Sequence, residues 1–234
     1  MCRGSRAILF VEPTDLLTRA LEDLQESVTG LVGAQNPGDA PGLVVVARLL
    51  EDGIEHLHRD RFHGAARVKK SHFDNKARVE AKVRQLGFPS FVILRPVFFM
   101  ENLAGPWFKP YIDQGNLAVG IKPGTKLQMI SVADIGKYGK LAFEKHAELN
   151  GKALDIAGDE LTMPQTAALI AKAAGKPVTH FQVPIEDVRK GSEDFALMLE
   201  WFDAVGYDAD IAVNAKAYGI RPTPFAEWVQ TVKW

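Results

Sequence analysis

The alternation of apolar and polar positions is most regular just before residue 90. Val79, Val83 and Leu86 recur at helical spacing, and charged or polar residues occupy the positions between them. This spacing predicts an amphipathic helix with one buried face. Gly87 follows directly, and glycine is the commonest residue after the last turn of a helix, so the helix is predicted to end there.

The pattern then changes from periodic to continuous. The run from Phe91 to Leu94 is wholly apolar and lies between Pro89 and Pro96. A short apolar run of this kind predicts a strand covered on both faces, as in a parallel sheet. Ligands of open α/β sheets bind at the carboxyl ends of the strands. The turn from Arg95 to Asn102 is therefore predicted to lie over a ligand site.

Similar patterns predict the other elements of the chain, and they alternate between strand and helix as in the α/β class. The predicted strands are Ala7–Val11, Val28–Ala34, Ile54–Leu57, Leu117–Val119, Leu127–Val132, Ala153–Ala157 and Val178–Val183. The predicted helices are one capped by Thr14, Leu43–Leu50, Ala133–Leu149, one opening at Thr162 or Met163, and several in the aromatic C-terminal part. Large aromatic residues mostly serve burial, so core packing is favoured over ligand contact for Trp201, Phe202 and Trp228.

Composition narrows the class of protein. The 234 residues are 47% hydrophobic and 24% charged, with a net charge of -1, which fits one globular domain without a global field for nucleic acid or anionic membrane. The single cysteine, Cys2, excludes a disulfide framework, and no metal site is predicted from the histidines. No apolar run of transmembrane length and no signal peptide is found, which predicts a cytoplasmic protein without membrane contact.

The segment from Arg59 to Lys70 is basic and lacks apolar periodicity. A solvated loop is favoured over a nucleic-acid site, because Phe62 is the only aromatic residue in the segment. A compensated reading-frame change in the gene is a third possibility.

Two motifs together resemble a known family. His72-Phe73-Asp74-Asn75-Lys76, followed by the segment Arg95 to Leu103, is similar to the NmrA-like family of atypical short-chain dehydrogenases/reductases. The resemblance extends from about Glu12 to the C-terminal tryptophan. It implies a Rossmann-like fold and binding of NADP or NAD. Members of this family act either as redox-sensing regulators or as reductases of quinones and related compounds.

The glycine-rich unit of a dinucleotide site is not found where it is expected. The strand Ile8–Val11 runs into Glu12–Asp15 without a glycine, and the acidic residues there would repel phosphate. Thr29–Ala34 contains two glycines but follows a helical pattern, so it is interpreted as a small-residue strand. The resemblance implies that the chain begins two βα units late, which would weaken cofactor affinity. Ala7–Val11 is then predicted to pair beside Val28–Ala34.

The expected fold is therefore α/β: an N-terminally truncated Rossmann-like, mostly parallel doubly wound sheet with a small α+β C-terminal lobe. A single domain, 1–234, is predicted. Its Rossmann-like core would comprise about residues 5–103 and 128–157, and the substrate-side lobe residues 104–127 and 158–234.

The resemblance also implies site residues. Lys76 matches the lysine that the family places near the nicotinamide ribose, and a lysine ammonium can hold ribose hydroxyls; an exposed helix lysine is the alternative. His72 stands where related reductases have a tyrosine general acid, and its alternative is a helix-start residue without a chemical role. The residues expected over the cofactor or beside the nicotinamide are Gln35, Asn36, Pro96, Val97 and Phe98.

Three functions are compatible with these features. The favoured hypothesis is a nucleotide-sensing regulator or partner-binding protein with weakened cofactor binding. Its expected partner is a dinucleotide, a protein is a candidate second partner, and direct nucleic-acid binding is not predicted. The second is an NAD(P)H-dependent oxidoreductase of quinones or similar carbonyl compounds. The third is a truncated product without activity. A missing glycine loop weighs most against the reductase, since hydride transfer requires a cofactor held in register.

Overall fold

The computed structural model describes residues 43–47, 80–81, 83–85, 88 and 90–234, with backbone only for 43–47. Residues 80, 81 and 83–85 are helical, which confirms the amphipathic helix for the positions described. The predicted strand after it is β2, Ser90–Pro96, whose residues are buried except for the partly exposed Phe91.

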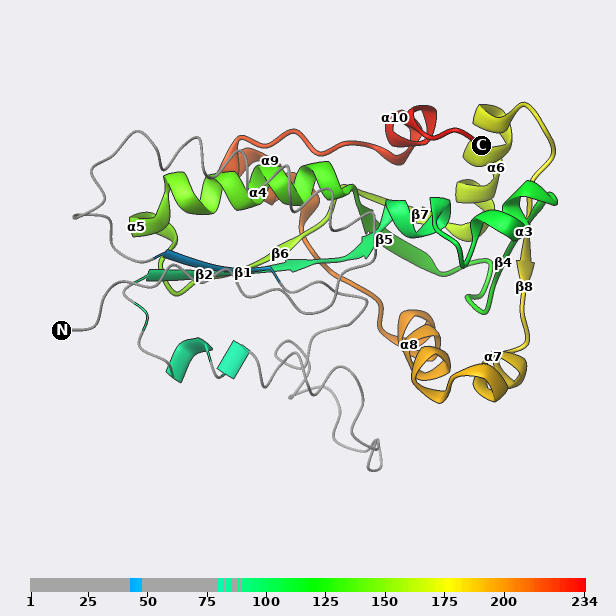
Figure 1. Ribbon diagram of the computed structural model, residues 1–234, viewed down its shortest axis with the longest axis horizontal. Helices are drawn as coiled ribbons and strands as arrows, with labels where there is room; N and C mark the ends of the chain where they lie inside the picture. The colour runs from blue at the N-terminus through cyan, green and yellow to red at the C-terminus, as the bar shows by residue number, and fades with distance from the viewer. Residues whose placement is uncertain (1–42, 48–79, 82, 86–87, 89) are drawn as a thin grey trace.

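A parallel sheet forms one half of the described structure. β2 lies at its centre, with β1 (Leu43–Ala47) on one side and β6 (Ala153–Ile156) on the other, and both pairings are parallel. α4 (Val132–Glu144) covers one face, and the helical residues 80–81 and 83–85 lie on the opposite face (Figure 1). This is an α/β arrangement with parallel strands between helices, as the sequence predicted.

The predicted helix over Leu43–Leu50 is wrong, because residues 43–47 form strand β1 in register with Ser90–Leu94. Apolar residues at 43, 46, 47 and 50 do fall at helical spacing. However, Val44 and Val45 fill the positions between them, so the run is apolar on every side and rich in β-branched residues. Both features favour a strand buried on two faces.

The second half of the chain adds two small sheets. β3 (Phe98–Phe99) pairs parallel with β5 (Lys126–Ile130), which pairs antiparallel with β7 (Asp159–Thr162). β4 (Asn116–Val119) pairs parallel with β8 (Thr179–Gln182). The strands predicted after residue 115 are thus confirmed, with ends shifted by one or two residues.

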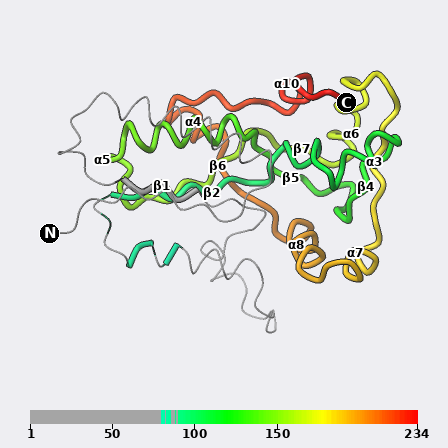
Figure 2. The backbone as a smooth tube through the Cα atoms, in the orientation of Figure 1, coloured from blue at the N-terminus to red at the C-terminus, as the bar shows by residue number. Residues whose placement is uncertain are grey.

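Helices connect and cover these strands. Following the tube in Figure 2 from β2 leads to α3 and β4, and later through α7 to α8. The helices not yet introduced are η1 (Met100–Ala104), α3 (Lys109–Asp113), α5 (His146–Leu149), α6 (Met163–Ala174), α7 (Ile185–Gly191), α8 (Glu193–Ala204), α9 (Ile211–Tyr218), α10 (Phe225–Trp228) and η2 (Val229–Thr231).

Local sequence explains where the helices α4 and α6 begin and where α6 ends. Ser131 caps α4 by accepting a hydrogen bond from the Asp134 backbone N–H at 3.2 Å. Thr162 and Gln165 form a reciprocal capping box at the start of α6, which also carries a proline in its first turn. Gly175 ends α6 at a φ of 65°, a backbone conformation that favours glycine. The predicted start of this helix is confirmed.

One large hydrophobic cluster joins the sheets and helices. Phe202 and Trp228 are 2% and 6% exposed, which confirms core packing for both. Trp201 is partly buried, and its ring lies 5.6 Å from that of Phe202 and 5.4 Å from that of Tyr207.

Several predictions fall outside the described residues: the strands Ala7–Val11, Val28–Ala34 and Ile54–Leu57, the basic segment and the Thr29–Ala34 motif. The division into a core and a substrate-side lobe stays a prediction.

Candidate functional site

The strand end that the sequence singled out is buried. Pro96 is the last residue of β2, Val97 follows it directly, and Phe98 opens β3; Val97 and Phe98 are 2% and 5% exposed. The ring of Phe98 meets that of Phe108 edge to face, with centroids 6.3 Å apart. These three side chains therefore belong to the core, and they offer a nicotinamide ring little surface beyond their edges. The cofactor contacts assigned to them stay predictions. Lys76, His72, Gln35 and Asn36 lie outside the described residues.

Arg95 is the charged residue at this strand end. Its guanidinium donates two hydrogen bonds to Glu80, at 3.0 Å to Oε1 and 2.8 Å to Oε2. It also lies 3.6 Å from Asp155 Oδ1, on the neighbouring strand position of β6. Burial alone would lower the pKa of Arg95, but the hydrogen bonds and charge of Glu80 hold that pKa above its ordinary value. This bidentate pair between Arg95 and Glu80 fixes the helical residues 80–81 and 83–85 to the end of β2.

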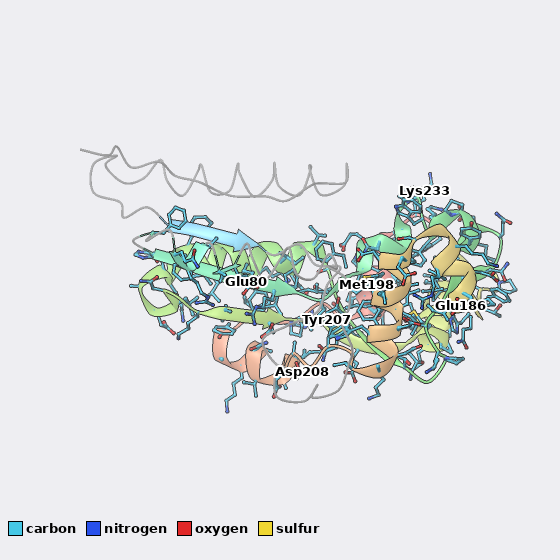
Figure 3. The ribbon with its side chains drawn as sticks, turned by 90° about the horizontal axis from the view of Figure 1, so that it is seen from below. Glu80, Glu186, Met198, Tyr207, Asp208 and Lys233 are labelled. Atoms are coloured by element: carbon cyan, nitrogen blue, oxygen red, sulfur yellow. The ribbon has the colours of Figure 1, made fainter. Side chains whose placement is uncertain are left out.

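The charge balance around Arg95 is negative. Burial raises the pKa of Asp155, the nearby Arg95 offsets part of that rise, and Asp208 adds to it. Figure 3 shows Asp208 beside Tyr207, on the connection between α8 and α9. The residue after it, Ala209, exchanges two hydrogen bonds of 3.0 Å with the buried Gln128 of β5. Two carboxylates, Glu80 and Asp155, thus engage one guanidinium, with Asp208 near enough to Asp155 to raise its pKa, and this part of the strand edge disfavours a phosphate group.

A second polar cluster holds the C-terminal segment. Asp134 accepts from the Thr223 backbone N–H at 2.7 Å and from its hydroxyl at 3.0 Å. Asp159 accepts from the Phe225 N–H at 2.8 Å, and Glu101 from the Trp228 indole at 3.0 Å. We call Glu101, Asp134 and Asp159 the carboxylate clamp. The clamp ties residues 223–228 to the start of α4 and to the turn after β3.

Within the clamp, Glu101 carries an incompletely paired carboxylate. Its Oε1 also accepts from the Val132 N–H at 3.1 Å, whereas its Oε2 has no hydrogen-bond partner in the described part of the chain. Burial raises the pKa of Glu101, and the hydrogen bonds that it accepts limit the rise. The next side chain, Asn102, has a buried Nδ2 that likewise lacks a partner among the described residues. The η1 segment after β3 therefore buries one amide donor and one carboxylate oxygen that have no hydrogen-bond partner among the described residues.

The part of the chain that the structure describes carries an apolar groove of about 510 Å³. It lies at the end of the molecule where α3, β4, β8, α7 and α8 come together (Figure 1). We call it the aromatic groove; it is lined by Phe108, Tyr111, Asn116, Ala118, Val119, Gly120, Phe181, Val183, Val188 and Phe195. None of these side chains is charged. Its link to the strand end is the contact between Phe108 and Phe98.

The described residues fit only part of a dinucleotide. An unpartnered buried amide at Asn102, near apolar Val97 and Phe98 in sequence, suits a neutral nicotinamide with its carboxamide. The pyrophosphate needs backbone N–H groups at a glycine-rich helix start or free cations. At the ends of β2 and β6 the guanidinium of Arg95 is already engaged by carboxylates, so the described edge does not fit the phosphates.

The sequence interpretation missed Glu80, Asp155 and the clamp. A signal for the first two was available, because Arg95 ends an otherwise apolar strand, and a buried guanidinium requires a carboxylate partner. The clamp joins residues separated by 66 to 127 positions, and no local pattern reports such pairs.

In the part of the chain that the structure describes, no helix is long and apolar enough to cross a membrane. In the same ranges, no group of three or more histidine, cysteine or acidic residues is arranged to hold a metal ion.

Comparison with known proteins gives one family and several structures. The family model described as the NmrA-like family matches residues 54–229. The chain is 29% identical over 113 residues to prestalk A differentiation protein A of Dictyostelium discoideum, a match that covers 48% of the chain but only 35% of that relative.

Solved structures share the fold at low identity. An NADPH-dependent quinone oxidoreductase of Escherichia coli superposes with a TM-score of 0.60 at 22% identity, covering 81% of this chain and 66% of that one. NmrA, a negative transcriptional regulator solved with NADP, gives 0.58 at 17% identity, covering 81% and 64%. A nucleoside-diphosphate-sugar epimerase of Staphylococcus aureus gives 0.59 at 16% identity, covering 96% and 74%. The chain thus spans about two thirds to three quarters of these structures, and at these identities the likeness concerns the fold alone.

Proposed function

Because the chain belongs to the NmrA-like family, we propose that it binds an NAD(P) dinucleotide weakly and acts as a nucleotide-sensing regulator or partner-binding protein. The dinucleotide would lie across the carboxyl ends of β1, β2 and β6, where open α/β sheets bind their ligands. Its nicotinamide would lie beside Pro96, Val97 and Phe98, with Lys76 near the nicotinamide ribose and Gln35 and Asn36 over the cofactor.

The observation that carries the proposal is the chemistry of the strand end. Apolar Val97 and Phe98 are followed by a turn whose Asn102 retains a free buried donor, which suits a neutral ring with a carboxamide. Arg95 is hydrogen-bonded to Glu80 and lies close to Asp155, so its guanidinium is not free to bind the phosphates at the same edge. Recognition of the nicotinamide half without strong phosphate binding supports a low affinity, which suits a sensor of cellular dinucleotide levels.

A regulatory role is favoured over turnover by the groups near the expected nicotinamide. Pro96, Val97 and Phe98 cannot donate a proton, and they are buried. A reductase of carbonyl compounds needs a proton donor placed within hydrogen-bond reach of the substrate oxygen. Related reductases have a tyrosine general acid at the position that His72 occupies in this chain. If His72 only starts a helix, no general acid is present at that position.

The second candidate is an NAD(P)H-dependent oxidoreductase of quinones or similar carbonyl compounds. One observation favours it: Phe98, expected beside the nicotinamide, touches Phe108, which lines the aromatic groove. A flat acceptor bound in that groove would be close to Phe98, and therefore close to the expected position of the reduced nicotinamide ring. The cofactor would supply the hydride, and the protein would orient the acceptor and exclude water.

Turnover separates the two candidates. The purified chain is mixed with NADPH, and separately NADH, with menadione as the acceptor, and loss of absorbance at 340 nm is followed. A regulator shows binding by thermal shift but no oxidation above the protein-free rate. A rate that scales with protein concentration, and that falls in His72→Phe, would establish the reductase and overturn the regulator.

A further inference from the structure

Three large aromatic side chains are exposed at or beside the aromatic groove. Tyr111 and Phe181, which line the groove, are 55% and 56% exposed. Trp107 is 82% exposed and directly precedes Phe108, which also lines the groove. Exposed apolar side chains that gather in one place mark interaction sites, whereas scattered single ones do not. The groove and its surroundings are therefore a contact surface for another molecule.

The backbone holds Trp107 beside the groove without placing it inside. The Lys109 backbone N–H donates to the Gly105 carbonyl oxygen at 3.0 Å, so residues 106–108 form a helical turn that leads into α3. Side chains four residues apart in such a turn share one side of it, as Trp107 and Tyr111 do. Trp107 does not line the groove of its own chain. Its ring is thus free to enter a second molecule.

One side of the groove carries excess negative charge. It is formed by α7 and α8, which contain six acidic and two basic residues. Arg189 is shared by three carboxylates, at 3.5 Å from Glu186, 2.6 Å from Glu193 and 2.5 Å from Glu200. We call α7 and α8 the acidic rim.

The opposite side of the groove, at α3, carries the reverse imbalance. Lys109 Nζ lies 2.8 Å and Lys176 Nζ 3.4 Å from Asp113 Oδ1, so one carboxylate is shared by two ammonium groups. We call Lys109, Asp113 and Lys176 the basic rim. Figure 1 shows α3 on one side of the β4–β8 pair and α7 and α8 on the other. The groove therefore separates two rims of opposite charge.

This arrangement of charge is complementary to itself. When two copies of the chain face each other across a two-fold axis parallel to the rims, the basic rim of each copy lies opposite the acidic rim of the other. An axis in the perpendicular direction would instead set like charges opposite each other, which is unfavourable. The favourable rotation also carries Trp107, at the basic side of each copy, towards the groove of the other.

The groove suits an indole ring. None of its lining side chains is charged, and its volume of about 510 Å³ lies within the range of roughly 300–1,000 Å³ typical of small-molecule sites, so one ring fits. Tyr111 and Phe181 can offer their faces and edges to that ring. The side-chain amide oxygen of Asn116 can accept the hydrogen bond that a buried indole N–H requires.

We propose that the aromatic groove and its two rims form a homodimer interface, in which Trp107 of each copy enters the groove of the other. This interface goes beyond the proposed function and does not depend on it, since none of the predicted cofactor residues lines the groove. A groove filled by Trp107 has no room for a carbonyl acceptor, so the dimer is compatible with the regulator and closes the acceptor site of the second candidate.

The expected affinity of the dimer is moderate. Aromatic side chains bury about 150–250 Å² each, so three partly exposed rings per copy supply on the order of 400 Å². This is about half of the roughly 800 Å² that each partner buries in a standard interface, and the charged rims supply the rest. We expect a dissociation constant of roughly 1–100 μM that rises with salt concentration.

The first test removes the ring that enters the partner. Sedimentation velocity of the full chain between about 1 and 200 μM measures self-association of the wild type, Trp107→Ser and Val213→Ser. Val213 is the matched control, because it is 58% exposed on α9 and does not line the groove. Trp107→Ser is expected to weaken the dimer at least about tenfold, and Val213→Ser less than about twofold. Both positions are exposed, so both variants are expected to fold.

The second test reverses the charge of each rim. Lys109→Glu combined with Lys176→Glu makes both rims acidic, and Glu186→Lys combined with Glu193→Lys makes both rims basic. Each variant alone sets like charges opposite each other and is expected to dimerise at least about tenfold more weakly than the wild type. An equimolar mixture of the two variants pairs opposite charges again and is expected to associate within about threefold of the wild type. Thermal unfolding confirms that each variant is folded.

Three results would overturn the proposal. A wild type that stays monomeric at about 200 μM would leave the groove to a different occupant. Equal effects of the 107 and 213 variants would place the contact elsewhere on the chain. A mixture of the charge-reversed variants that associates no better than either alone would exclude the two-fold pairing of the rims. None of these readouts involves a dinucleotide, so failure of this proposal is distinguishable from failure of cofactor binding.

Discussion

The carboxylate clamp is predicted to contribute strongly to stability, and this is best tested at Asp134. Asp134 is the most buried residue of the clamp, and it accepts two hydrogen bonds from the C-terminal segment. The Asp134 side chain is 1% exposed and binds both the N–H and the hydroxyl of Thr223. In Asp134→Ala both bonds are lost, and the Thr223 N–H keeps no partner among the described groups. Hydrogen bonds to a charged group contribute about 1.5–3 kcal/mol each, and they are not additive, so we expect a loss of about 3–5 kcal/mol in the free energy of unfolding.

The control variant separates the clamp from the ion pair on the same carboxylate. Lys137 Nζ lies 2.6 Å from Asp134 Oδ1, but its side chain is 50% exposed, so Lys137→Met is expected to cost at most about 1 kcal/mol. Urea unfolding followed by tryptophan fluorescence at neutral pH measures both variants. A loss below about 1 kcal/mol in Asp134→Ala, or equal losses in the two variants, would refute the assignment of the clamp to Thr223.

Three further variants test other parts of the structure. Because the pKa of Glu101 is raised above 4.5, the folded state binds its proton more tightly, so the wild type should gain stability as pH falls from neutral toward 4.5; urea midpoints for Glu101→Gln should lack this gain. Burial lowers the pKa of His180 below 6.5, so the unfolded state takes up this proton first and the wild type should lose stability as pH falls below 6.5; thermal unfolding of His180→Gln over the same pH range should show a smaller loss. Arg95→Met should cost about 3–5 kcal/mol, because Glu80 and Asp155 keep their charges without the guanidinium, while the double variant with Glu80→Leu should recover much of that loss; additive losses in denaturant titrations would contradict the coupling.

Local signals predicted a large part of the described fold. The prolines around Phe91–Leu94 and the capping residues of α6 lie within a few positions of the elements that they predict. Strand β2 and helix α6 both form where these local patterns predict them. The β1 segment shows the limit of such signals. Part of its apolar spacing matched a helix, and its pairing with β2, more than forty residues later, shows that the β-branched run is a strand.

The candidate site could be predicted less completely, because its interactions are long-range. Glu80 and Arg95 are close enough in sequence to be paired by reasoning about a buried guanidinium. The bond between Glu101 and Trp228, or a groove formed by five elements, depends on the whole tertiary arrangement. Resemblance to a family supplied the cofactor residues, and Lys76 remains the one whose role can be tested most cleanly.

The most direct test of dinucleotide binding is calorimetric titration of the purified chain with NADPH, and separately NADH, for the wild type, Lys76→Met and Lys233→Met. Lys233 is an exposed lysine near the C-terminus and serves as the matched control. We expect saturable binding with a dissociation constant of about 10 μM to 1 mM, weakened at least about tenfold by Lys76→Met and unchanged by Lys233→Met. Absence of saturable binding at roughly 10 mM cofactor, or equal effects of the two lysine variants, would contradict a dinucleotide site at this sheet edge.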